Sequence, residues 1–207
     1  CALAAQPPAP VPPRVGNGRV QGRCPGHLRC VAPHGARAQT VREAVGSDGA
    51  RLLVHSVDIA ADADLLWSAL STAEGWQSWA VPVAFVDFRI GGEFETSYSR
   101  AALKGDPANI RNRILAIVPG RMLVIQAVQA PPGFPHREIL PDLWSVIEIE
   151  PLAAGRTRVT LTGGGYRTSP AHDGLFAFFR AGNAQALGNL RDSLEHGPIN
   201  WAAIAAP

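Results

Sequence analysis

The sequence predicts an α+β fold in which an antiparallel sheet of about seven strands packs against one long C-terminal helix. Two observations carry this prediction. Between residues 86 and 162, short stretches in which apolar and polar residues alternate are separated by turn residues, which indicates strands joined by hairpins. Residues 169–197 instead repeat apolar residues at helical spacing. A helix of this length after a run of strands is expected to lie across their sheet.

The order of the elements follows from the same patterns. Leu53–Ile59 alternates and is expected to form the first strand, and two short helices follow at residues 61–70 and 72–79. Six further strands are expected, at residues 86–90, 93–98, 111–118, 121–128, 143–150 and 156–162.

Gly163-Gly164-Gly165 precedes the last helix. Because this segment lacks the lysine and hydroxyl of a phosphate-binding loop, it is interpreted as a flexible connection.

The last helix has recognisable ends. Ser169 or Asp173 can cap its start and Gly197-Pro198 ends it, so a length of about 20 residues is expected. Its apolar face contains Phe179, and Asn183 lies on or beside that face. Because asparagine has a low helix propensity, its presence there favours a role toward the interior of the protein.

Residues 1–40 differ in composition from the rest of the chain. They contain seven of the 18 prolines and show no periodicity, so they are expected to be a disordered arm or the remnant of a processed leader. Ala36-Arg37-Ala38 has the A-x-A form of a signal-peptidase site and favours export, for example to the periplasm, although no apolar segment precedes it. A cytoplasmic location is the alternative. The domain itself is expected over residues 41–200, with a short tail at 201–207.

All three cysteines lie in this first segment. Cys24, His27, Cys30 and His34 are of types that bind zinc, but prolines interrupt them and no packed frame follows, so no metal site is expected. The predicted domain therefore contains neither a thiol nucleophile nor a disulfide. No cofactor is expected either.

The charge and hydropathy of the chain exclude two classes of partner. The net charge is +2, but the first 40 residues hold five of the 19 basic residues and no acidic one, so the remainder carries 14 basic against 17 acidic residues. A mildly acidic domain without a basic stripe is not expected to bind nucleic acid. No run approaches the roughly 20 apolar residues that a membrane span needs, so none is expected.

Several motifs, in their order and spacing, resemble one superfamily. They are Val57-Asp58-Ile59 running into residues 61–70, Trp76 and Trp79, residues 87–94, residues 114–123, and the hairpin of 144–150 with 157–162. Over residues 52–195 the chain resembles the START/Bet v 1-like (SRPBCC) superfamily, and within it the branch of domains similar to the Hsp90 ATPase activator. The resemblance implies a helix-grip fold, in which a curved sheet grips the C-terminal helix and encloses a cavity for an apolar ligand.

Strand parity then predicts which apolar side chains face that cavity. The alternative is a filled core without a void. The expected aromatic and aliphatic lining residues are Trp67, Trp79, Phe88, Phe94, Ile125, Ile147, Phe176 and Phe179. Phe134 and His136, in the loop of residues 130–141, are expected at the cavity mouth, with Phe134 a candidate for a lid or for contact with a partner.

Parity also places polar side chains on the inward faces, where each needs a hydrogen bond. They could orient the polar end of a ligand, or they could satisfy one another and buried water. These residues are His55, Thr96, Tyr98, Asn112 and Ser145 from the strands, together with Asn183 from the helix.

The expected function is binding of a small apolar or amphipathic molecule, lipid-like or otherwise, inside the domain. An enzyme of cyclase or dehydratase type acting in the same cavity is one alternative, and a protein-interaction domain like the chaperone cofactor is another. No catalytic residue is assigned. His55 has no acid on its own face to orient its ring, and no G-x-S-x-G motif occurs.

Overall fold

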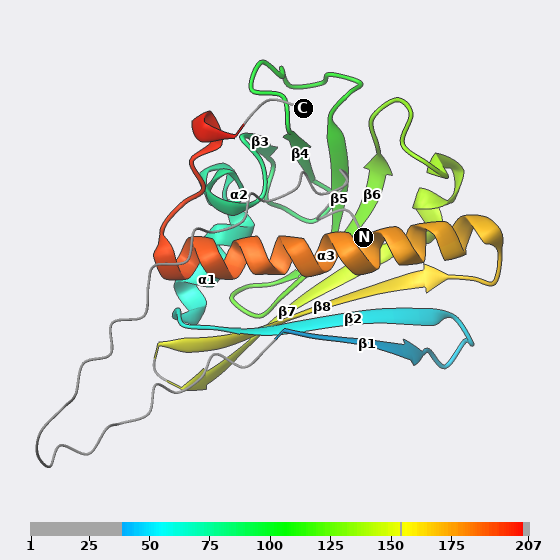
Figure 1. Ribbon diagram of the computed structural model, residues 1–207, viewed down its shortest axis with the longest axis horizontal. Helices are drawn as coiled ribbons and strands as arrows, with labels where there is room; N and C mark the ends of the chain where they lie inside the picture. The colour runs from blue at the N-terminus through cyan, green and yellow to red at the C-terminus, as the bar shows by residue number, and fades with distance from the viewer. Residues whose placement is uncertain (1–38, 154, 205–207) are drawn as a thin grey trace, which may run out of the picture.

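The computed structural model describes residues 39–153 and 155–204, and its centre is one antiparallel sheet (Figure 1). The order across the sheet is β1-β2-β8-β7-β6-β5-β4-β3. The strands are β1 (Thr40–Val45), β2 (Arg51–Ile59), β3 (Val83–Val86), β4 (Glu93–Ser97), β5 (Ile110–Val118), β6 (Met122–Gln129), β7 (Trp144–Ala153) and β8 (Arg156–Tyr166). With the long helix described next, this confirms the predicted α+β, helix-grip fold.

Three α-helices accompany the sheet: α1 (Ala63–Ser71), α2 (Ala73–Trp79) and α3 (Pro170–His196). Figure 1 shows α3 lying across the sheet, with α1 and α2 near its C-terminal end. Two short 3₁₀ helices, η1 (Arg137–Asp142) and η2 (Trp201–Ala203), complete the described elements. No helix within the described ranges is both long and apolar enough to cross a membrane.

The long helix α3 runs for 27 residues, which is more than the predicted length. Ser169 is its N-cap, because its hydroxyl oxygen accepts a hydrogen bond from the backbone N–H of His172. Pro170 occupies the first turn, and Gly197 follows the last residue with a φ of 105°. The two predicted ends are therefore correct, and the helix is unbroken between them.

The sheet contains a strand that the sequence pattern did not indicate. Residues 40–45 form β1, which pairs with β2 along its length. This strand lies at the edge of the sheet and is mostly exposed, so it lacks the apolar alternation by which the other strands were predicted. The predicted strand at residues 86–90 was also misplaced, because β3 ends at Val86 and the chain turns through Asp87 to Gly92.

Gly163-Gly164-Gly165 is part of β8 and not a flexible connection. Gly165 has a φ of +89°, and an added Cβ would lie 1.9 Å from the backbone oxygen of Asp142. A Cβ on Gly164 would lie 2.2 Å from the Trp144 ring. These positions require glycine because β8 here passes directly against the end of η1 and the start of β7.

The interior contains two separate apolar clusters. The first, here named the α1–α2 cluster, includes Leu66, Trp79, Ile125 and Leu190 and joins the two short helices to the C-terminal half of α3. The second, named the η1 cluster, joins η1 and the loop before it to the N-terminal half of α3; its buried members are Leu53, Ile110, Ala127, Ala130, Leu140, Leu143, Tyr166, Leu175, Phe176 and Phe179.

A buried histidine holds α3 to the sheet between these clusters. The Nε2 atom of His55, on β2, lies 3.0 Å from the backbone oxygen of Arg180 on α3. Because a carbonyl oxygen only accepts, Nε2 carries the proton and donates. Burial of the ring, which is 0% exposed, lowers the pKa of His55 below 6.5, so the imidazole is neutral near pH 7.

Replacement of Gly165 by alanine is expected to lower the free energy of unfolding by more than about 2 kcal/mol, because the positive φ and the Asp142 backbone both oppose a Cβ. Gly188→Ala in α3 is the matched control, since its Cβ would meet nothing within 4 Å. We expect that change to raise the free energy of unfolding by up to about 1 kcal/mol. Urea denaturation measures both, and equal effects would contradict the close approach at Gly165.

Protonation of His55 is expected to destabilise the fold. Because its pKa in the folded protein is below 6.5, the unfolded chain binds more protons once the pH falls through 6.5, and the free energy of unfolding then decreases. His55→Gln keeps an N–H donor for Arg180 and should flatten this decrease, as measured by thermal denaturation from about pH 8 to pH 5. His196→Gln, which removes an exposed imidazole, should leave the decrease in place. An unchanged pH profile in His55→Gln would refute the assignment.

Candidate functional site

A set of buried polar side chains lies on the inward faces of the sheet and of α3, each between residues of the two apolar clusters. We call it the polar belt. Each member is at most 5% exposed, although none is charged near pH 7. Its members are His55 on β2, Thr96 on β4, Asn112 on β5, Ser145 on β7 and Asn183 on α3.

Side-chain parity and the neighbouring residues place these side chains between the two clusters. On β2, the inward-facing neighbours of His55 are Leu53, which belongs to the η1 cluster, and Val57, which belongs to the α1–α2 cluster. Three other elements repeat this arrangement, with one flanking residue from each cluster. The flanking pairs are Leu143 and Ile147 around Ser145, Ile110 and Ile114 around Asn112, and Phe179 and Ala186 around Asn183.

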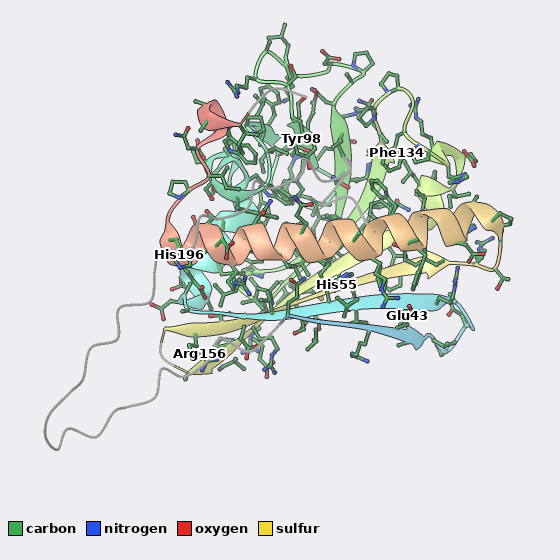
Figure 2. The ribbon with its side chains drawn as sticks, viewed as in Figure 1. Glu43, His55, Tyr98, Phe134, Arg156 and His196 are labelled. Atoms are coloured by element: carbon green, nitrogen blue, oxygen red, sulfur yellow. The ribbon has the colours of Figure 1, made fainter. Side chains whose placement is uncertain are left out.

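Parity places the fifth member on the same inward face of the sheet. Thr96 on β4 pairs with Ile110, and Phe94 pairs with Asn112, so Thr96 shares their inward face. The next inward residue, Tyr98, is half-buried and packs against both clusters. Figure 2 shows Tyr98 and His55 on opposite sides of α3. The belt therefore runs beneath the helix from the β2 side of the sheet to the β4 side.

The belt contains buried polar atoms without a hydrogen-bond partner among the described residues. They are His55 Nδ1, Asn112 Oδ1, Ser145 Oγ, Asn183 Nδ2 and Asn183 Oδ1. Buried polar atoms in native proteins are almost always hydrogen-bonded, to protein, water or ligand. Four side chains that share one interior surface thus all have unused hydrogen-bonding capacity.

The electrostatics of the belt are those of a neutral surface. Since His55 donates through Nε2 and is neutral, its Nδ1 atom presents a lone pair and acts as an acceptor. Burial raises the pKa of Tyr98 to about 12, so its phenol remains protonated. The belt can therefore accept and donate hydrogen bonds, and it contains one buried base of moderate strength.

The apolar residues predicted to line a cavity are distributed over both clusters. Trp79, Phe94, Ile125 and Ile147 are buried in the α1–α2 cluster, and Phe176 and Phe179 in the η1 cluster. Trp67 and Phe88 are only half-buried at the margin of the α1–α2 cluster, where their rings meet edge to face at 5.6 Å. Of the eight, the structure brings Phe94, Ile125, Ile147 and Phe179 next to belt residues.

The two residues predicted at the mouth lie in the chain segment before and at the start of η1. Phe134 packs on Phe178 and Phe179, with ring centroids 5.4 Å and 6.4 Å away, so it covers the N-terminal half of α3. His136 is exposed, has a φ of 53°, and places Nδ1 3.7 Å from Glu138. Figure 2 shows Phe134 above the helix. Phe134 is therefore already engaged in an aromatic cluster.

A second polar group, at the start of α3, was not predicted. His172 is 6% exposed, its Nδ1 lies 2.8 Å from Ser169 Oγ, and its Nε2 lies 3.7 Å from Asp142 Oδ2. The S-x-x-H spacing at the helix start was the available signal. The distance to Asp142 exceeds a hydrogen bond, and Ser169 Oγ accepts from the N–H of His172, so the group acts as a helix cap and not as a catalytic triad.

The described residues contain no group of three or more histidine, cysteine, aspartate or glutamate side chains that could hold a metal ion. The possible signal-peptidase site at Ala36-Arg37-Ala38 and the cluster of Cys24, His27, Cys30 and His34 lie outside the described residues. So does the predicted arm, except for its last two residues, of which Thr40 begins β1. The predicted tail is represented by η2, whose Trp201 indole donates to the backbone oxygen of Gln77 at 2.5 Å.

Three solved structures share the fold at low sequence identity. The Aha1 dimer from Colwellia psychrerythraea is 18% identical, with a TM-score of 0.55 and coverage of 70% of this chain and 97% of that chain. CalU16 from Micromonospora echinospora is 21% identical, with a TM-score of 0.56 and coverage of 81% and 80%. Protein MLL2253 from Mesorhizobium loti is 21% identical, with a TM-score of 0.52 and coverage of 72% and 100%.

These likenesses concern the fold alone. A comparison with curated proteins found no match. A family model matches residues 60–195, from the end of β2 almost to the end of α3, and its description is Activator of Hsp90 ATPase homolog 1-like protein. The match covers more than half of the chain and agrees with the resemblance seen in the sequence. The chain belongs to the family of Activator of Hsp90 ATPase homolog 1-like proteins.

Proposed function

We propose that this domain binds a small amphipathic molecule between the sheet and α3, with the polar part of the molecule on the polar belt. The observation that carries the proposal is the set of unpartnered buried atoms on His55, Asn112, Ser145 and Asn183. A ligand that reaches all four would contact the sheet and the helix together. Its apolar parts would lie against side chains of the two flanking clusters.

The energetics favour a bound partner over an interior that serves stability alone. Leaving a buried donor or acceptor unsatisfied costs about 1–3 kcal/mol, and the belt has five such atoms on four residues. Apolar side chains of similar size at these positions would avoid that cost. Ordered water could satisfy some of these atoms. A ligand with hydrogen-bonding groups would satisfy them and would also supply apolar contacts.

The position of the belt agrees with what the superfamily resemblance implies. In a helix-grip domain the ligand lies between the sheet and the C-terminal helix, and the belt has members on both elements. His55 and Asn183 meet this condition most directly, because His55 is hydrogen-bonded to the turn of α3 that precedes Asn183.

A second candidate function, acid–base chemistry on the bound molecule, is favoured by one observation. The Nδ1 atom of His55 is an unprotonated nitrogen whose tautomer is set by the Arg180 carbonyl. Such a nitrogen could remove a proton from a bound substrate, as a cyclase or dehydratase would require. No carboxylate is hydrogen-bonded to the ring among the described residues, so we rank this function second.

A protein partner is a third possibility, because the family takes its name from an activator of Hsp90 ATPase. Contact with a protein commonly uses a continuous exposed apolar patch. The large apolar side chains exposed here come from β1, α1, β5, β7 and several connecting segments, including Val45, Leu65, Leu115 and Leu152. This distribution does not single out one face, so the interior carries the stronger argument.

Protein purified from its own host is expected to carry a small molecule, detectable as an added mass by native mass spectrometry and recoverable by organic extraction. Ser145→Ala and Asn183→Leu should each reduce its occupancy at least about fivefold, since each removes a hydrogen-bonding group that the molecule uses. After extraction of the molecule, the melting temperatures of these variants should equal or exceed that of extracted wild type, because an unpartnered buried polar group is lost. Lower occupancy with undiminished stability is the signature of a binding role.

The matched control is Ser56→Ala. Ser56 is also a strand serine, but it lies on the outer face of the sheet, with its hydroxyl 3.3 Å from that of Thr160. This variant should retain the molecule at wild-type occupancy. A wild-type protein without added mass, and without a thermal shift across a panel of lipids and aromatic compounds, would refute the proposed function.

A further inference from the structure

We infer that the polar belt selects a molecule whose buried polar group is uncharged and donates a hydrogen bond, such as a hydroxyl on an apolar skeleton, and that it excludes carboxylates and phosphates. This inference rests on the proposed function and specifies the ligand class. It depends on the absence of available charge around the belt, on the acceptor presented by His55, and on the cost of burying an unpaired anion.

The buried charged side chains of the described chain do not serve the belt. Asp58 lies on the outer face of β2, where Arg158 donates to it at 2.7 Å. Glu95 accepts from Asn109 Nδ2 at 2.7 Å and from the N–H of Gly105, so it holds the loop before β5. His55 and Thr96 face the interior. Asp58 and Glu95 lie an odd number of residues from them on the same strands, so both carboxylates point to the opposite face.

Two arginines approach the interior, and each is already paired. Arg51 shares the parity of His55 on β2, but it forms an ion pair with Asp173 at 2.5 Å and lies 4.7 Å from the centre of the Phe176 ring. Arg180 forms an ion pair with Glu43 at 2.6 Å on the exposed side of α3. Both guanidinium groups thus already have a carboxylate partner, although Arg51 Nε is buried without a hydrogen-bond partner among the described residues.

The hydrogen-bonding atoms of the belt favour a donor. His55 Nδ1 is an acceptor, because the proton is on Nε2, and the side-chain oxygens of Asn112 and Asn183 are acceptors as well. Ser145 can donate or accept, and Asn183 Nδ2 donates. A hydroxyl both donates and accepts, so it can satisfy an acceptor such as His55 Nδ1 or a donor such as Asn183 Nδ2. A carboxylate only accepts and would place its charge against the lone pair of His55.

An anion on this belt would be buried without a counter-ion. The desolvation of a carboxylate is offset in proteins by a paired cation or by several strong donors. Among the described residues the belt offers no unpaired cation and few donors, so a carboxylate is expected to bind at least about 30-fold more weakly than the matching alcohol. Phosphate esters carry more charge and should be excluded more strongly.

The test uses matched probes that differ only in the polar group. Isothermal titration at pH 7.5 would compare decan-1-ol with decanoate, and 2-naphthol with both 2-naphthoate and 2-methoxynaphthalene. We expect the alcohol of at least one skeleton to bind at least about 30-fold more tightly than its carboxylate. The methyl ether, which is neutral but cannot donate, should bind at least about tenfold more weakly than 2-naphthol, because it leaves His55 Nδ1 unpaired.

Variants connect this preference to the belt. Ser145→Ala should weaken binding of the preferred alcohol, and Ser56→Ala on the outer face should not. Binding of a carboxylate as tightly as its alcohol, with the same sensitivity to Ser145→Ala, would overturn this inference and leave the proposed function standing. Equal binding of 2-naphthol and its methyl ether would also overturn it. If no probe binds and the protein from its own host has no added mass, the proposed function itself fails.

Discussion

A polar atom that is removed from water must find another hydrogen-bond partner, and this constraint governs how the interior of the domain can be used. Many buried polar groups find this partner within the chain. The Trp76 and Trp79 indoles, for example, donate to the backbone oxygens of Leu70 and Ala69 at 2.8 Å and 3.0 Å. The polar belt does not, since four side chains leave five atoms without a partner among the described residues. This difference is the basis for proposing that the belt, and not the apolar clusters, contacts a ligand.

The two apolar clusters allow the belt to remain in this state. The α1–α2 cluster contains fully buried tryptophan, phenylalanine, leucine and isoleucine side chains, and the η1 cluster adds Tyr166, Phe176 and Phe179. Burial of each large apolar side chain contributes about 1.5–3 kcal/mol, so several of them on each side offset the unsatisfied atoms between them. His55 links the sheet to α3, because its Nε2 atom donates a hydrogen bond to the backbone oxygen of Arg180. Its Nδ1 atom has no partner among the described residues. His55 thus stabilises the fold and also belongs to the proposed binding site.

Much of this arrangement follows from the sequence, because side-chain parity is a local property. Alternation was enough to place His55, Asn112 and Ser145 on inward faces, and helical spacing placed Asn183 on the face of α3 that meets them. The edge strand β1 escaped prediction because it is held by backbone pairing with β2 and not by an apolar face. Which of these polar residues lie near one another could not be predicted either. This depends on strand register, which the bulges in β2 and β5 shift.

Family membership and the belt are separate properties of this chain. The family match begins at residue 60, after His55, so membership carries no information about the residue that sets the acceptor character of the belt. Asn112, Ser145 and Asn183 lie inside the matched segment, but the match describes a fold that the low-identity structures share as well. The ligand class must therefore be read from these particular side chains. The belt has a neutral histidine with a fixed tautomer, two amides and a hydroxyl, and the described residues offer it no unpaired cation. These features are why we propose recognition by hydrogen-bond geometry and not by charge.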